Sequence, residues 1–178
     1  MPWSVPVKRQ FEKVPANPSK ADFHGPYNKL LYSLFPADSL FMVIPPLPAS
    51  HESADFLTLF EVLFEDKPVI ILGLNPPSHL RYPSNRKAAD KEIRDRIIDL
   101  IDDCPIPVLF AVHAMGTKLC FFTKRSGQPV QPRAISPGPT YGTNTAPRER
   151  WEYDILEEEG ELKFREMVEE IKQACAAL

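Results

Sequence analysis

The chain has 178 residues, of which 43% are hydrophobic and 25% are charged, so its composition fits one globular domain with a sizeable core and excludes wholesale disorder. The 20 prolines against 7 glycines predict several irregular connections and leave no glycine-rich phosphate loop. The net charge of -3 gives no general nucleic-acid signature, and any basic patch must therefore be local.

Three widely separated cysteines, Cys104, Cys120 and Cys175, form neither a disulfide framework nor a zinc-ligand spacing. They indicate a reducing compartment. The N-terminal stretch MPWSVPVKRQFEKVP has no apolar signal core, and no run approaches ~18 consecutive apolar residues. We therefore expect an intracellular protein, cytoplasmic or nuclear, with no membrane partner.

Residues 1–25 precede the first clear hydrophobic pattern. They contain four prolines and several cations without a period, which predicts an extended N-terminal arm, free to wrap the body. The remaining residues, 26–178, are predicted to form one domain. It opens with a helix over 27–35, where apolar residues recur at helical spacing after Pro26.

Hydrophobic runs predict the strands. Three runs, at 40–44, 54–64 and 69–74, have the length and the bounding residues of strands, and the short polar joint between the last two predicts an antiparallel hairpin. Two further runs, at 108–114 and 118–124, predict a second hairpin.

Two helices and a long loop complete the predicted fold. Ser84 is expected to cap a helix over 85–102 that carries one apolar stripe. Residues 126–147 hold five prolines and no period, which predicts a long surface connection before a last helix from Glu161. The interleaved order predicts an α/β or α+β domain with a mixed central sheet of about five strands flanked by helices.

Asp55 lies near the start of a predicted strand whose other residues are typical of a core. A carboxylate there is costly unless it sits at the strand end, in a cleft or on a cation. It is therefore a candidate metal ligand. The simpler alternative is a strand-end aspartate that accepts hydrogen bonds from the adjoining turn.

The order of helix, Asp-bearing strand, hairpin partner and cation-bearing helix resembles the core of the PD-(D/E)XK nuclease superfamily, over roughly residues 26–124. In that superfamily the partner strand carries an acid, one intervening residue and a lysine. The matching tripeptide here is Gly73-Leu74-Asn75, followed by two prolines. The stretch from Asp55 to the RKAADKEIRDR helix is also similar to uncharacterised proteins of mushroom-forming fungi, in which the tripeptide reads acid, apolar residue, lysine.

The resemblance implies a restriction-endonuclease-like core whose ancestral chemistry is Mg²⁺-dependent phosphodiester hydrolysis. In such nucleases two acids hold the divalent cation, and the lysine orients the attacking water and stabilises developing phosphorane charge. Here Gly73 supplies no oxygen and Asn75 carries no charge. Gly73 is most simply a position that has lost its side chain, either in natural descent or by deliberate substitution.

Of the metal ligands that the resemblance implies, Asp55 is the one that remains. Mg²⁺ usually needs at least one or two carboxylates, so we expect weak Mg²⁺ binding or none. Glu61 lies further along the same strand, roughly 20 Å away, which is too far for shared coordination. We expect Glu61 to be a solvated residue on the face of the strand.

Cations cluster on and before the helix that follows the motif. The resemblance implies that Arg86 or Lys87 faces the cleft and contacts phosphate, and Lys87 is also a candidate catalytic residue. Arg81 and Arg94 complete the candidate nucleic-acid-binding set. The alternative is an ordinary solvated helix face with alternating charges.

Two other constellations have structural alternatives. His113 and Cys120 face each other across the second predicted hairpin, but the apolar neighbours of Cys120 are typical of a core cysteine rather than a nucleophile. Arg148, Arg150 and Trp151 either stack on a base and meet phosphate or pin the long loop to the body. The acidic run that follows them favours the second interpretation.

From these observations we expect a catalytically impaired nuclease-fold protein that binds nucleic acid or protein. One alternative is an active metal-dependent nuclease whose second carboxylate comes from elsewhere in the chain. Another is a protein-protein interaction module without a nucleic-acid role. DNA, RNA and a second copy of the chain in a homodimer are the partners that these possibilities leave open.

Overall fold

A mixed six-stranded sheet forms the centre of the computed structural model, which describes residues 2–46, 58–140 and 142–178. The strands lie in chain order, and they are β1 Phe41–Ile44, β2 Thr58–Phe64, β3 Lys67–Asn75, β4 Val108–Met115, β5 Lys118–Arg125 and β6 Tyr153–Asp154. Neighbouring strands are antiparallel except for β3 and β4, which are parallel. This confirms the predicted α/β class with a mixed sheet. The sixth strand escaped prediction because two residues are too short to show a period.

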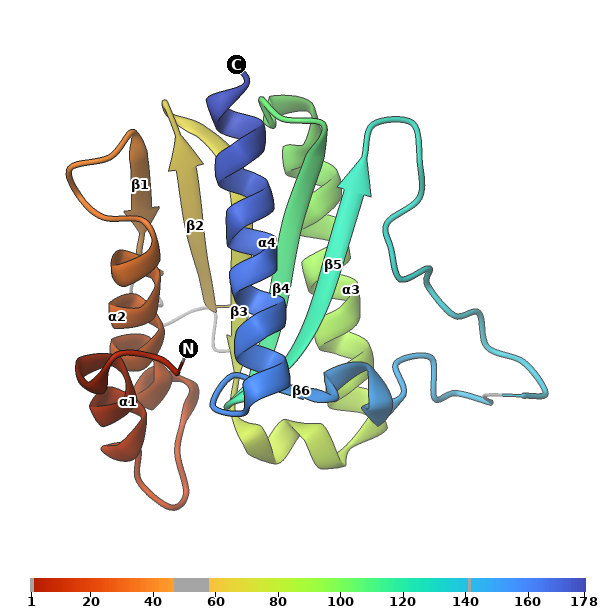
Figure 1. Ribbon diagram of the computed structural model, residues 1–178. Coiled ribbons are helices and arrows are strands. Elements are labelled where there is room, and N and C mark those ends of the chain that lie inside the picture. The colour runs from red at the N-terminus through yellow and green to blue at the C-terminus, as the bar shows by residue number, and fades with distance from the viewer. Residues whose placement is uncertain (1, 47–57, 141) are drawn as a thin grey trace.

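Helices cover both faces of the sheet (Figure 1). They are α1 Val5–Glu12, α2 His24–Leu34, α3 Pro83–Leu100 and α4 Glu158–Ala176, together with the short 3-10 helices η1 Lys20–Phe23, η2 Pro77–Arg81, η3 Ile101–Asp103 and η4 Arg148–Trp151. In the view of Figure 1, α4 crosses the front of the sheet and α3 lies behind it. No helix within the described ranges has both the length and the apolar character needed to cross a membrane.

Alternation along β3 divides the interior into two cores. Ile70, Leu72 and Leu74 belong to the core shared with α1, α2 and α4, whereas Ile71 belongs to the core under α3. Successive side chains of a strand point to opposite faces, so Gly73 and Asn75 lie on the α3 face. Because helices cover both faces, β3 is an almost continuous apolar run rather than an alternating one.

The N-terminal segment differs from the extended arm predicted for residues 1–25. It forms α1 and η1, and Phe11 of α1 packs edge-on against Tyr27 of α2 with ring centroids 5.3 Å apart. The Trp3 indole donates to the Ile155 carbonyl at 2.7 Å. A helix of eight residues that buries only Val7 and Phe11 shows too little periodicity to be predicted, and its stability comes from these tertiary contacts.

The other predicted elements are present with shifted ends. The helix expected over 27–35 is α2, and the first hairpin turns through Glu65 and Asp66, both with positive φ (45° and 67°), as in the turns that join antiparallel strands tightly. Ser84 is not the cap of α3, because the helix begins at Pro83 after Tyr82. The long connection after β5 contains no helix among its described residues and extends away from the body (Figure 1).

Candidate functional site

The candidate site lies where the parallel strands β3 and β4 end side by side. Asn75 closes β3 and pairs with Met115 at the end of β4. Beyond the carboxyl ends of parallel strands the chain leaves the sheet, and in open α/β folds ligands bind at such ends. Here η2 follows β3 directly, which brings His79 back beside Asn75.

Four side chains at this end of the sheet form one hydrogen-bonded chain, which we call the relay: Trp151, His113, Asn75 and His79. Trp151 Nε1 lies 3.1 Å from His113 Nδ1, and His113 Nε2 lies 2.8 Å from Asn75 Oδ1. Asn75 Nδ2 lies 3.3 Å from His79 Nδ1. The four residues come from η4, β4, β3 and η2, so only the folded chain assembles the relay.

The relay is uncharged at neutral pH. His113 is fully buried, and burial, with a smaller contribution from His79, lowers its pKa to about 3. Burial and the nearby Lys20 also lower the pKa of His79. Asn75 therefore joins two neutral imidazoles. It occupies the position where the resemblance places a lysine, and it supplies neither a positive charge nor a proton that can ionise there.

Gly73 lies in a regular part of the sheet. It pairs with Leu59 on one side and with His113 on the other, and the register shift between β2 and β3 falls elsewhere, between Val62 and Leu63. A glycine in a strand often marks a bulge, but none is present at this position. The backbone thus gives no reason for a glycine, and the position lies next to the relay through His113.

The predicted metal site is only partly within the described residues. Asp55, the one acid of the motif, lies outside them. Gly73 has no side chain, and Asn75 Oδ1 already accepts a hydrogen bond from His113. Over residues 2–46, 58–140 and 142–178 no three His, Cys, Asp or Glu side chains are grouped so that they could hold a metal ion. Of the two motif positions in β3, only Asn75 offers a side-chain oxygen, and this oxygen lies 2.8 Å from His113 Nε2.

Two of the four predicted nucleic-acid-binding cations point into the protein. Arg86 is only 5% exposed, and it donates to the carbonyls of Leu80 and Ala146 at 2.7 and 2.8 Å. Arg94 is 8% exposed and donates to Asp90 at 2.8 Å. Both guanidinium groups are buried: Arg86 is bonded to oxygens of the protein, whereas Arg94 bonds Asp90 through Nε and its Nη2 is buried without a partner among the described residues.

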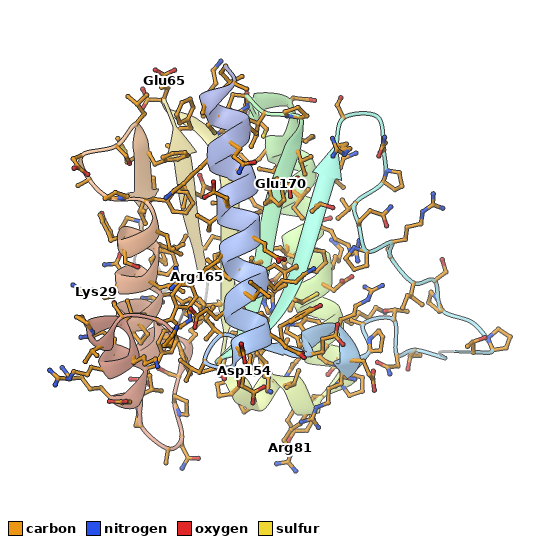
Figure 2. The ribbon with its side chains drawn as sticks, in the orientation of Figure 1. Lys29, Glu65, Arg81, Asp154, Arg165 and Glu170 are labelled. Atoms are coloured by element: carbon orange, nitrogen blue, oxygen red, sulfur yellow. The ribbon has the colours of Figure 1, made fainter. Side chains whose placement is uncertain are left out.

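The other two predicted cations are exposed. Arg81 ends η2 and projects from the molecule (Figure 2), and Lys87 lies in the first turns of α3. Because η2 and the start of α3 follow β3 directly, both residues come from the stretch of chain that leaves the site. The first turn of α3 contains no acidic residue that would neutralise them.

The loop that precedes η4 is tied to α3 and to the relay. Arg150 donates to Asp90 at 3.1 Å and to the Arg133 carbonyl at 2.6 Å. Trp151 is buried and contacts His113. In this structure the Arg150-Trp151 pair pins the long loop to the body, which is the second of the two interpretations of that motif.

Several smaller predictions can be placed. Cys120 is buried opposite His113 in the sheet, and burial raises the pKa of its thiol to about 12, so it is a core cysteine. Glu61 is not simply solvated, since it forms an ion pair with Arg96 at 2.5 Å. No local pattern predicts that pair, because the two residues lie on different elements, 35 positions apart.

Sequence reasoning missed His79 and the contact of Trp151 with His113. Strand alternation places His113 on the same face as Ala111 and Met115, which is a signal for burial under α3. No local sequence pattern, however, predicts that His79 turns back toward Asn75.

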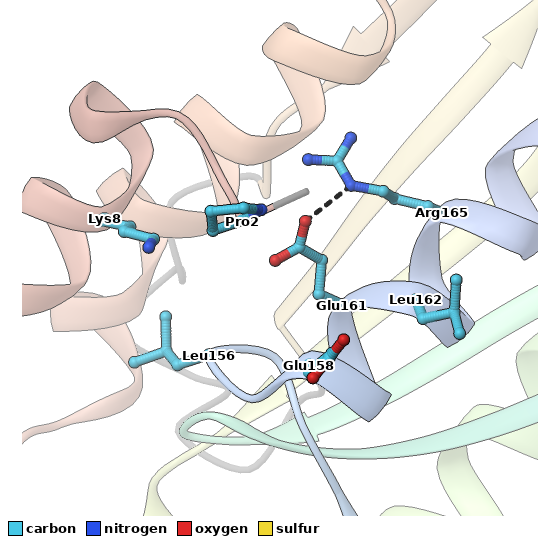
Figure 3. A pocket seen from close by; sticks show the side chains of 7 residues that line it. All are labelled: Pro2, Lys8, Leu156, Glu158, Glu161, Leu162 and Arg165. Atoms are coloured by element: carbon cyan, nitrogen blue, oxygen red, sulfur yellow. Dashed lines mark hydrogen bonds and ion pairs between the residues drawn. The ribbon is translucent and has the colours of Figure 1, made fainter.

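A pocket of about 410 Å³ lies elsewhere, between the N-terminal segment and the start of α4 (Figure 3). Its buried carboxylate, Glu161, accepts hydrogen bonds from the Trp3 backbone N–H at 3.1 Å and from Arg165 at 2.8 Å. Glu161 therefore holds the N-terminal segment on α4 through the backbone of Trp3.

The chain matches no protein-family model, and no curated protein and no solved structure resembles it at a significant level.

Proposed function

We propose that the chain is a catalytically impaired nuclease-fold protein that binds nucleic acid at the carboxyl end of β3 and no longer hydrolyses it. The order of elements expected from the resemblance supports this proposal, because α2, β2, its hairpin partner β3 and the cation-bearing α3 occur in this order along the chain, with β1 between α2 and β2. Fold alone does not fix function, so the residues of the site must support the proposal.

The observation that carries the proposal is the position of Asn75 within the relay. At the point where a nuclease of this type needs an ammonium group, an amide is held between two imidazoles whose pKa values are lowered. A neutral amide cannot stabilise the charge of a phosphorane as lysine does. The geometry favours recognition of a ligand over hydrolysis.

Binding is assigned to the exposed cations beside the site. Arg81 and Lys87 are available for phosphate contacts, whereas Arg86 and Arg94 hold the scaffold. Contacts of this kind release counterions that are condensed on the nucleic acid. This release contributes less free energy as the salt concentration rises, so binding weakens. We expect binding at low ionic strength that falls steeply as salt is added.

The first experiment tests hydrolysis. Plasmid, single-stranded DNA and RNA are incubated with Mg²⁺ or Mn²⁺ and either the unaltered protein or a Gly73→Glu, Asn75→Lys variant. We expect that only the restored variant cleaves. Cleavage by the unaltered protein that disappears in Asp55→Ala would instead identify an active nuclease.

The second experiment tests binding by mobility shift at low salt. Arg81→Glu combined with Lys87→Glu is expected to abolish the shift. Lys29→Glu combined with Lys67→Glu is the matched control, because it reverses two exposed charges on α2 and at the opposite end of β3. Lys29 and Arg81 lie well apart in Figure 2. A protein that binds no nucleic acid at low salt would favour a protein-protein interaction module.

A further inference from the structure

Trp151 determines which atom donates and which accepts in each hydrogen bond of the relay. The Trp151 indole N–H can only donate, and its nitrogen lies 3.1 Å from His113 Nδ1. That imidazole nitrogen must therefore accept. Neutral His113 consequently carries its proton on Nε2.

The same direction passes through Asn75 to His79. His113 Nε2 donates to Asn75 Oδ1 at 2.8 Å, which orients the amide so that Nδ2 faces His79 Nδ1 at 3.3 Å. An amide nitrogen can only donate, so His79 Nδ1 accepts. Neutral His79 then carries its proton on Nε2, and the relay ends in an N–H donor.

The surroundings of His79 suit an oxygen anion. Its Nε2 has no hydrogen-bond partner among residues 2–46, 58–140 and 142–178, and the residue is partly exposed. Lys20 lies close enough to lower the pKa of His79. Arg81 is exposed at the end of the same short helix. An N–H donor held in one orientation can bind a phosphate oxygen through a short hydrogen bond that the charge of the acceptor strengthens.

We infer that His79 Nε2–H, oriented by Trp151 through His113 and Asn75, donates a hydrogen bond to a phosphate oxygen of the ligand. This inference rests on the proposed function, which identifies that ligand as nucleic acid. It makes His79 a binding residue and Trp151 a positioning residue. The base of the long loop is thereby connected to His79 through three hydrogen bonds, and to the ligand through a fourth.

The tautomers can be measured directly. Long-range ¹H–¹⁵N spectra of the ¹⁵N-labelled chain at neutral pH are expected to show both His113 and His79 protonated on Nε2. Asn75→Asp is nearly isosteric, but a carboxylate only accepts, so the His79 proton is expected to move to Nδ1 while His113 keeps its tautomer. Protonation of His79 on Nδ1 in the unaltered protein overturns the inference, even if the variant does not fold.

Binding tests the contact itself. His79→Phe keeps an aromatic ring but removes the donor, and it is expected to weaken binding of a short fluorescein-labelled single-stranded DNA at low salt by roughly tenfold. His79→Gln is the matched control, because its amide still donates, and it is expected to retain most of the affinity. Thermal unfolding checks that both variants are about as stable as the unaltered protein.

Inorganic phosphate separates failure of the inference from failure of the proposed function. If the unaltered protein binds DNA and His79→Phe binds it equally well, the inference is wrong and the proposed function stands. If the unaltered protein binds no nucleic acid, the proposed function is wrong, and titration with inorganic phosphate decides the inference. A saturable shift of the His79 Nε2–H signal supports the phosphate contact, and its absence overturns it.

Discussion

The indole of Trp151 stands edge-on to the imidazole of His113, with ring centroids 5.8 Å apart and the ring planes at 88°. The two residues are 38 positions apart in the chain, and both are buried. Their contact joins the end of the long loop to a central strand of the sheet. Through Asn75 it also reaches the surface at His79. The candidate site and the anchoring of the loop are therefore one structure.

Stability is expected to fall at acidic pH because His113 must stay neutral. Its pKa is about 3 in the folded protein against 6.5 in the unfolded chain, so below pH 6.5 the unfolded state binds a proton that the folded state does not. This contribution is complete above pH 6.5 and is lost progressively as pH falls toward 3. The slope contributed by this group reaches about 1.4 kcal/mol per pH unit. Urea unfolding of the unaltered protein and of His113→Gln between these pH values measures it, and parallel curves would contradict the assignment.

Asp90 is expected to be important for stability because it pairs with two covered arginines. Arg94 lies 2.8 Å and Arg150 lies 3.1 Å from its carboxylate, and all three side chains are 10–12% exposed. Asp90→Asn leaves these guanidinium groups without their counter-charge and is expected to lower the free energy of unfolding by about 3 kcal/mol. Chemical denaturation measures the change.

Asp95 on the same helix provides the control for Asp90. Its ion pair with Lys91 is largely exposed, with side-chain exposures of 57% and 75%. Asp95→Asn is therefore expected to change unfolding very little, because solvent screens such pairs. Equal effects of the two substitutions would show that burial of Asp90 and its two arginines does not increase the free energy of unfolding.

Gly116 is expected to tolerate no side chain. Its φ of +65° favours glycine, and a Cβ at this position would lie 2.9 Å from Cβ of Pro77. Gly127 has a similar φ of +71° with nothing within 4 Å of the added carbon, so Gly127→Ala measures the backbone cost alone, roughly 1–2 kcal/mol. Gly116→Ala is expected to be clearly more destabilising in thermal unfolding. A smaller or equal effect would mean that η2 moves freely, which the relay does not allow.

Cys120 is expected to be inert toward thiol reagents in the native protein. Burial raises its thiol pKa to about 12, so almost no thiolate is present at neutral pH. Burial likewise raises the pKa of Cys175 to about 11. We expect slow reaction with a disulfide reagent at mildly alkaline pH and complete reaction of the thiols after unfolding. Rapid labelling of Cys120 in the native protein would contradict this and favour the alternative in which Cys120 is a nucleophile paired with His113.

Local sequence patterns determined the main elements of the sheet and its crossover helix. Runs of apolar residues predicted β1, β3, β4 and β5, and the polar pair Glu65-Asp66 predicted the first hairpin, because these features act over a few neighbouring residues. The apolar stripe of α3 and the core position of Cys120 were predicted for the same reason. Residues 54–57 of the predicted second strand, which include Asp55, lie outside the described residues.

Only the tertiary structure decided which polar residues face a ligand. Arg86 and Lys87 are adjacent in sequence, yet Arg86 is covered because Ala146, 60 residues later, returns to accept its hydrogen bond, while Lys87 stays exposed. Trp3 turns the predicted arm into part of the domain by a contact 152 residues away. The relay likewise needs four elements to meet. Hydrophobic periodicity reports which face of an element is buried, but the partner of a polar side chain depends on where distant segments return, and that is decided by packing of the whole chain.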